Sequence, residues 1–127
     1  MIQNALDNLV VKLNDIEGIG LVYSVPPARP QIPSVLVEPN NSWVSVRPDE
    51  YDASWGSNWR VTVMVKPQDN SLEMTNLISV VDSIATGLWE YEDVTNITVD
   101  KPFIIDVNGA AVLSTYMNIS IDMQGGN

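Results

Sequence analysis

The sequence predicts an α+β domain, with an antiparallel β-sheet and two α-helices packed on one face of it. Two long segments, one at the N-terminus and one over residues 71–88, carry apolar residues at helical spacing. A central segment, residues 59–66, alternates between two faces, as a half-buried strand does. With 127 residues, 45% of them hydrophobic, the chain is expected to form a single domain spanning 1–127.

The first helix is expected over Ile2–Ile16, where one apolar stripe runs along an otherwise polar segment. Gly18 and Gly20 should end it, because glycine readily adopts the conformations that follow a helix. The second helix is expected over Ser71–Leu88, and Asn70 can cap its first turn.

Short apolar or alternating runs between turn residues predict the strands. In chain order they are Leu21–Val25, Ser34–Glu38, Trp43–Arg47, Trp59–Lys66, Val94–Val99, Phe103–Val107 and Val112–Met123. Prolines within 26–33 predict an extended connector, Pro39 should end one strand, and Asn108-Gly109 is a strong hairpin signal. Most joins are hairpin-like, which favours an antiparallel sheet.

The run Phe103–Ile105 is apolar on both faces. Such a strand is typically buried on both sides. We therefore expect its second side to be covered by a neighbouring subunit or by a loop of the same chain.

The segment 48–58 is polar, acidic and aromatic and has no periodicity. It predicts a long exposed loop or the tip of a long hairpin, and segments of this kind often carry function. Its acidic residues could in principle bind Ca²⁺, but their spacing does not match an EF-hand loop and favours a solvated loop. The candidate interface residues in this segment are Asp49, Glu50, Tyr51, Asp52 and Trp55.

Three of the four tryptophans fall into two groups. Trp59 begins a strand and Trp89 ends a helix, so both are expected in the core or at its rim. Trp55 lies beside Tyr51 in the polar segment, where an aromatic ring suits a protein interface, local packing or stacking on a sugar.

The chain has no cysteine and no histidine. A Ser-His-Asp or Cys-His triad and a zinc–thiolate site therefore cannot form. Sixteen acidic residues make some carboxylate pair inevitable, but nothing singles one out as a catalytic pair. We predict a protein that is not an enzyme, with no catalytic residues, no cofactor and no metal.

The formal net charge is −10, and the six basic residues are scattered along the chain. Nucleic-acid-binding surfaces neutralise phosphates with clustered Lys and Arg, so this composition argues against one. No segment approaches the roughly 18 apolar residues of a membrane span, and the N-terminus lacks the pattern of a signal peptide. We expect no membrane partner and a protein made and used inside a cell, or built into a particle there.

Four blocks carry a resemblance to a known family. They are the helix Ile2–Ile16 running into Gly18-Ile19-Gly20, the strand Trp59–Val65, the helix Leu77–Leu88, and Val107–Val112 leading into Tyr116–Ile121. In this order they resemble the tail terminator (tail completion) proteins of bacteriophages with long non-contractile tails.

The resemblance implies a structural virion protein of the tail or neck, assembled in the host cytoplasm. Such subunits form a ring, usually a hexamer, that caps the tail tube and joins it to the head. The implied partners are further copies of the chain, the major tail tube protein and a head-completion or connector protein, while DNA passes through the ring without specific binding. Two alternatives stay open: another head–tail connector, neck or tail tube protein, and a small carbohydrate- or ligand-binding module.

Overall fold

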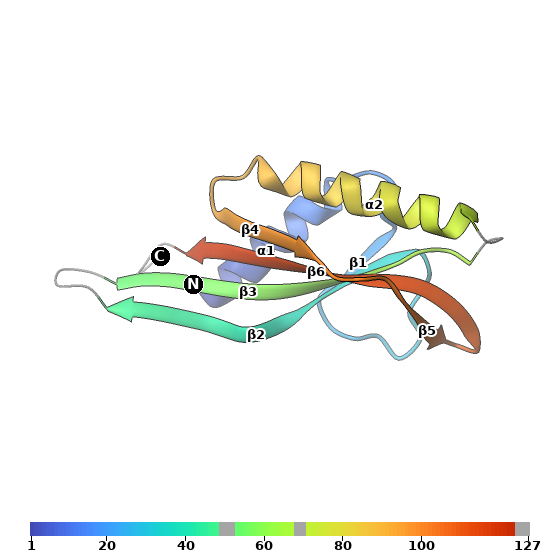
Figure 1. Ribbon diagram of the computed structural model, residues 1–127. Helices are drawn as coiled ribbons and strands as arrows, with labels where there is room; N and C mark the ends of the chain where they lie inside the picture. The colour runs from blue at the N-terminus through green and yellow to red at the C-terminus, as the bar shows by residue number, and fades with distance from the viewer. Residues whose placement is uncertain (49–52, 68–70, 124–127) are drawn as a thin grey trace.

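A computed structural model describes residues 1–48, 53–67 and 71–123 of the chain. Two helices and six strands alternate along it (Figure 1). In chain order they are α1 (Ile2–Asn14), β1 (Leu21–Tyr23), β2 (Ser34–Pro48), β3 (Ala53–Met64), α2 (Ser71–Trp89), β4 (Val94–Val99), β5 (Phe103–Val107) and β6 (Ala110–Met123). Both predicted helices are present, and each boundary lies within two residues of its predicted place.

The strands form a sheet in the order β1-β2-β3-β6-β4, and β5 pairs with β6 beside this path. All pairings among β2 to β6 are antiparallel, which confirms the α+β fold class. β1 differs from the expectation because it runs parallel to β2. The connector over residues 24–33 carries the chain back along the sheet before β2 begins, and a parallel pair requires such a crossover.

Both helices lie on the same face of the sheet, as predicted, and we call this the helix face (Figure 1). The main core fills the space between them. Its largest fully buried members are Leu9, Leu13, Leu77, Ile84 and Leu88 from the helices, and Trp59, Val61, Met117 and Ile119 from β3 and β6. The alternation of 59–65 therefore has the predicted consequence, since its apolar positions all point into this core.

β2 is one long strand where the sequence predicts two. Pro39 does not end it; the strand continues past an irregularity between Pro39 and Val44. Because β1 pairs only with Ser34–Leu36, Pro39 lies on an open edge, where its missing N–H costs no sheet hydrogen bond.

For the segment 48–58 the sequence predicts a long loop or the tip of a long hairpin, and the structure agrees with the hairpin. Pro48 ends β2, and residues 53–58 belong to β3, so the two strands form a long hairpin that extends beyond the helices (Figure 1). Trp55 pairs with Val46 on one side and Met123 on the other, and this pairing overrides the low strand propensity of the Gly56–Asn58 segment. The candidates Asp49, Glu50, Tyr51 and Asp52 lie outside the described residues.

β5 folds against the far end of β6, where Met64, Val107 and Val112 form a second, smaller core. The turn before β6 is the predicted hairpin, with positive φ at Asn108 and Gly109. Of the two covers predicted for 103–105, a loop of the same chain is absent from the described residues, where Ile104 is 60% exposed and β5 has packing partners on one face only. Cover by a neighbouring subunit stays a prediction.

Candidate assembly surfaces

The sheet ends at β4 in an edge that pairs with no further strand of the described residues. The Asp100 N–H donates to the Tyr116 carbonyl oxygen at 2.8 Å, so the backbone of Asp100 faces β6. Backbone groups alternate in direction along an antiparallel strand. The N–H and C=O groups of Val99 and Ile97 therefore point away from β6, along the open edge.

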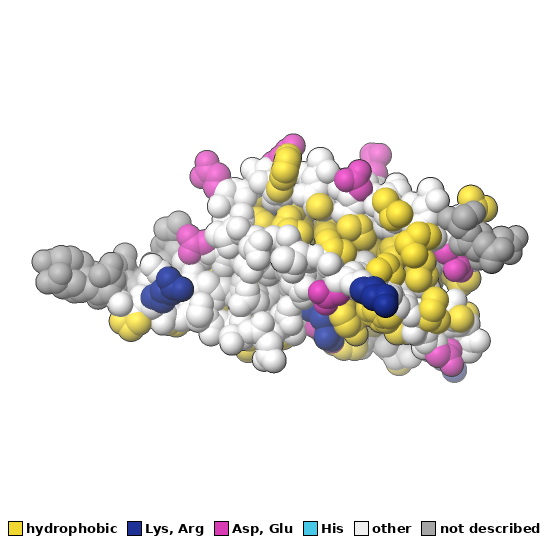
Figure 2. All heavy atoms as spheres, viewed as in Figure 1, with side chains coloured by type: hydrophobic (Ala, Val, Ile, Leu, Met, Phe, Trp, Pro, Cys, Tyr) yellow, Lys and Arg dark blue, Asp and Glu magenta, His cyan; other side chains and the backbone are white. Residues whose placement is uncertain are grey.

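A groove of about 530 Å³ lies next to this edge, between α2 and β4. Ala85 and Trp89 line its helix side, and Ile97 and Val99 line its strand side. Figure 2 shows hydrophobic side chains gathered in this region, with acidic side chains along the rim formed by α2. Trp89 is 74% exposed, so the expectation that it lies in the core or at its rim is wrong.

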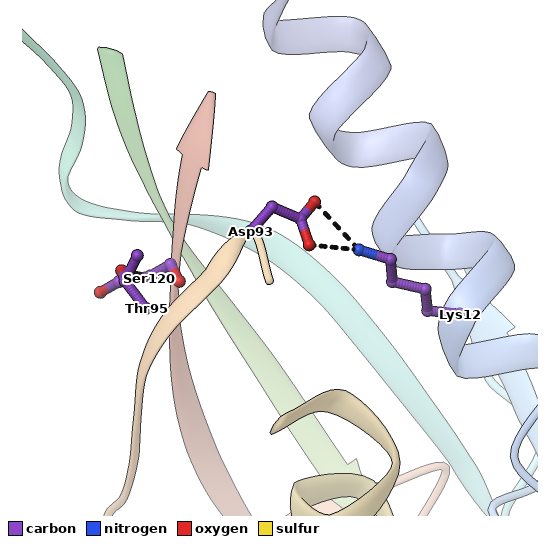
Figure 3. A network of polar contacts seen from close by, with 4 residues as sticks. All are labelled: Lys12, Asp93, Thr95 and Ser120. Atoms are coloured by element: carbon purple, nitrogen blue, oxygen red, sulfur yellow. Dashed lines mark hydrogen bonds and ion pairs between the residues drawn. The ribbon is translucent and has the colours of Figure 1, made fainter. Parts of the chain in front are cut away.

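The turn that follows Trp89 is held in place by contacts from α1 and β6. Lys12 of α1 holds this turn through Asp93, with Nζ 2.7 Å from Oδ1 (Figure 3). The Lys12 ammonium also lies 4.1 Å from the centre of the Tyr91 ring. One residue further on, β4 joins the sheet, and the Asp122 N–H donates to the Asp93 carbonyl oxygen. α2 thus ends at the turn that leads into β4, and the Trp89 side chain is exposed there.

The opposite side of the sheet offers a second open edge. The Leu21 N–H donates to the Pro33 carbonyl oxygen, and β1 then covers β2 only as far as Leu36. We call residues 39–48 of β2 the free segment, because no described strand pairs with its outer side.

Hydrogen-bond parity fixes which groups of the free segment point outward. The Val65 N–H donates to the Leu113 carbonyl oxygen. Backbone groups alternate in direction, so at every second residue from Val65 back to Trp55 the N–H and C=O groups point toward β6. Val46, the partner of Trp55 in β2, must therefore direct its N–H and C=O away from β3. Its side chain is 44% exposed, as is that of Trp43.

Trp55, the one candidate interface residue within the described chain, lies on the helix face of the hairpin. It is half-buried and packs against the main core. Local packing, one of its three interpretations, is therefore present, and its role in an interface stays a prediction.

The face of the sheet opposite the helices, which we call the open face, is polar over its central part. Asn118 of β6 accepts a hydrogen bond from Asn40 at 2.7 Å and donates to Thr98 and Asp100 at 3.1 Å each. These contacts join β2, β6 and β4 across the sheet. Arg60 lies beside them, bonded to the Glu38 carboxylate and stacked 4.2 Å from the Tyr116 ring.

No group of three or more potential metal ligands occurs within residues 1–48, 53–67 and 71–123. In the same ranges, no helix has the length and hydropathy of a membrane span.

The groove and the β4 edge were not predicted from the sequence. Two signals were available: the segment 94–99 carries no charge, and Trp89 ends a helix that has apolar residues outside its main stripe. Edge strands usually carry charges or prolines that prevent pairing, so an uncharged edge is informative once the strand order is known.

Comparison with known proteins finds a likeness among solved structures. No protein-family model matches the sequence, and no curated protein matches it. Among solved structures, the fold is similar to that of a chain in the virion of a native gene transfer agent particle, with a TM-score of 0.50 and 11% sequence identity. The match covers 91% of this chain and 92% of that one, so nearly the whole domain shares its fold with a virion protein.

Proposed function

We propose that this chain is a structural subunit of a phage-like virion and that it acts as a tail terminator. In this role, copies of it form a ring, with six as the expected number, that caps the tail tube and joins it to the head. The observation that carries the proposal is the fold shared with a chain of a gene transfer agent virion over nearly the full length of both chains. The protein then works in the tail or neck of the particle, after assembly in the host cytoplasm.

The surfaces of the described chain support an assembly role. Two open sheet edges lie on opposite sides of the subunit, and one of them borders an apolar groove. Exposed apolar patches rimmed by polar residues typically mark protein–protein contacts. A subunit with two different binding surfaces on opposite sides associates head to tail. Such an assembly closes into a ring when the rotation between neighbouring subunits divides a full turn evenly.

The charge fits a ring through which DNA passes. Two of the six basic side chains, Lys12 and Arg60, are engaged in ion pairs with Asp93 and Glu38. A net charge of −10 repels phosphates, so the ring would let DNA pass without specific binding. The partners proposed for it are the major tail tube protein on one side and a head-completion or connector protein on the other.

The experiment that tests this function is tube termination. Purified protein is added to polymerising tube protein of the same virion, and tube lengths and ends are measured by negative-stain electron microscopy. A terminator shortens the tubes with increasing dose and forms a ring at one end. Tubes of unchanged length with bare ends overturn the proposal, and long tubes formed by this chain alone identify it as a tube subunit.

Tyr51→Ala tests the candidate contact segment. As the proposed anchor on the tube, Tyr51 is expected to be needed for capping, so the variant should cap at least tenfold more weakly than the wild type. Val11→Ser, on the exposed side of α1, is the matched control and should cap normally. Equal capping by the two variants removes Tyr51 from the interface.

A further inference from the structure

The two open edges of the sheet complement one another. Strand directions alternate strictly along β2, β3, β6 and β4. A β2 strand placed beside β4 would therefore be antiparallel to it and continue the alternation. The subunit carries at one side the strand that its other side could accept.

The side chains at the two edges also match by face. Val44 and Val46 of the free segment pair with Ser57 and Trp55, which places both valines on the helix face. On β4, Ile97 and Val99 lie on the helix face. If the edges join so that the helix faces of both subunits lie on the same side, apolar side chains lie beside apolar ones. The join then lies next to the groove that Trp89 lines.

The open-face residues match in the same way. Ser45 and Arg47 of the free segment lie on that face, as do Asn96 and Thr98 of β4. Polar side chains would therefore meet polar ones across the join. Cross-strand neighbours of like character are what stabilises a sheet.

The levels of the two edges show how the join is staggered. Ile97 lies at the height of Pro39, because Pro39 pairs with Trp59, Trp59 with Ile119 and Ile119 with Ile97. Proline has no N–H to donate. A neighbour bound through Val44 and Val46 is therefore shifted along the strands until these valines lie opposite Ile97 and Val99.

We propose that the occupant of the β4 edge is a second copy of this chain, bound through the free segment of its β2. The outward N–H and C=O groups of Ile97 and Val99 bond to those of the neighbour's free segment, and Trp89 covers the join from the helix side. The proposal rests on the proposed ring and assigns its subunit contact. It is heterologous, so each copy uses both edges and neither stays open.

Two proline variants test the contact, because proline removes an N–H without adding charge. Val99→Pro and Val46→Pro each remove an outward donor and leave the bonds to β6 and β3 in place. Sedimentation velocity at micromolar concentration should show rings for the wild type and single chains for either variant. Val11→Ser should form rings as the wild type does, and a thermal midpoint within a few degrees of the wild type establishes that each variant is folded.

Mixing the variants decides between head-to-tail and two-fold pairing. Val99→Pro keeps an intact free segment and Val46→Pro keeps an intact β4 edge, so an equal mixture should give a dimer that grows no further. Dimers of Val46→Pro alone would mean that two β4 edges pair with each other, which overturns the proposal. If Val99→Pro does not fold, Trp89→Ser replaces it in the same mixture.

The remaining outcomes separate this proposal from the proposed function. Rings and tube capping that survive Val99→Pro overturn the contact and leave the terminator function standing. If neither variant forms rings alone, their mixture gives a dimer, and wild-type rings do not cap tubes, the function is overturned and the contact stands. A wild type that stays a single chain, alone and with tube protein, overturns both.

Discussion

Lys12 and Asp93 are 81 positions apart in sequence, and their side chains meet at 2.7 Å. The ammonium is held on two sides, by both carboxylate oxygens and by the ring of Tyr91. This contact ties the first helix to the turn that leads into β4. The N-terminal element of the fold therefore helps to place the edge that we assign to subunit contact.

Removing the cation from this contact should destabilise the protein modestly. We expect Lys12→Met to lower the free energy of unfolding by about 1 kcal/mol, since the Asp93 side chain is 39% exposed and solvent screens the pair. Urea unfolding measures the change. Asp7→Asn, which alters an exposed contact with Gln3, is the control and should cost less than about 0.5 kcal/mol. Equal losses for both variants would show that the contact contributes nothing particular.

Two glycines with the same backbone conformation should respond very differently to alanine. Gly18 and Gly20 both have φ of +84°, but a Cβ on Gly18 meets nothing within 4 Å, whereas one on Gly20 would overlap the Pro33 carbonyl oxygen. Gly18→Ala should cost about 1 kcal/mol from backbone strain alone. Gly20→Ala should cost about 3 kcal/mol or more, because the segments must also move apart. Similar denaturation midpoints for the two would contradict this difference.

Asn118 should be the most sensitive residue of the open face. Its side chain joins three strands, so Asn118→Ala should cost about 1–2 kcal/mol by leaving partners unsatisfied. The exposed Asn96 of β4 provides the comparison, and Asn96→Ala should change stability by less than about 0.5 kcal/mol. Chemical denaturation of both variants measures the difference, and an inverted order would refute it.

Trp55 and Trp59 separate assembly from folding. Trp59 is 1% exposed, so Trp59→Ala should cost about 3–5 kcal/mol and leave little folded protein. Trp55 is half-buried, and Trp55→Ala should cost about 2 kcal/mol and leave a folded domain. If Trp55 contacts the tube, this folded variant should bind tube ends at least tenfold more weakly. Full binding by a folded Trp55→Ala would remove it from the interface.

The elements with a clear local signal could be predicted from the sequence. The alternation of 59–65 identified the face of β3 that enters the core, and the stripes of both helices identified their buried sides. Asn108 and Gly109 form the expected hairpin because few other residues tolerate positive φ. In each case, one short segment contains the whole physical reason for its structure.

The errors arose where the structure depends on a distant partner. Pro39 resembles a strand end locally, but it lies on an edge where no donor is required. Gly56 and Asn58 resemble a loop, but pairing with β2 and β6 on both sides keeps them extended. Trp89 was expected in the core or at its rim, and its exposure depends on which elements cover it rather than on its own hydrophobicity.

The candidate site was the least accessible part of the molecule to sequence reasoning. Nothing in the segment 94–99 shows that β4 lies at the edge of the sheet, since strand order is a property of the whole fold. The groove beside it requires in addition that α2 and β4 lie next to each other. The candidates chosen from composition, at 49–52, lie outside the described residues.

The hydrogen bonds of the open face have a consequence for anything that moves along it. Asn58 accepts from Ser120 at 2.7 Å, and Asn40 bonds to Asn118, so these short amides and hydroxyls are already engaged with one another. These four side chains therefore have less hydrogen-bonding capacity left for a polymer that moves over this face than unpaired amides and hydroxyls would. The same side-chain hydrogen bonds thus hold the strands together and leave fewer polar groups on this face to bind a polymer that passes over it.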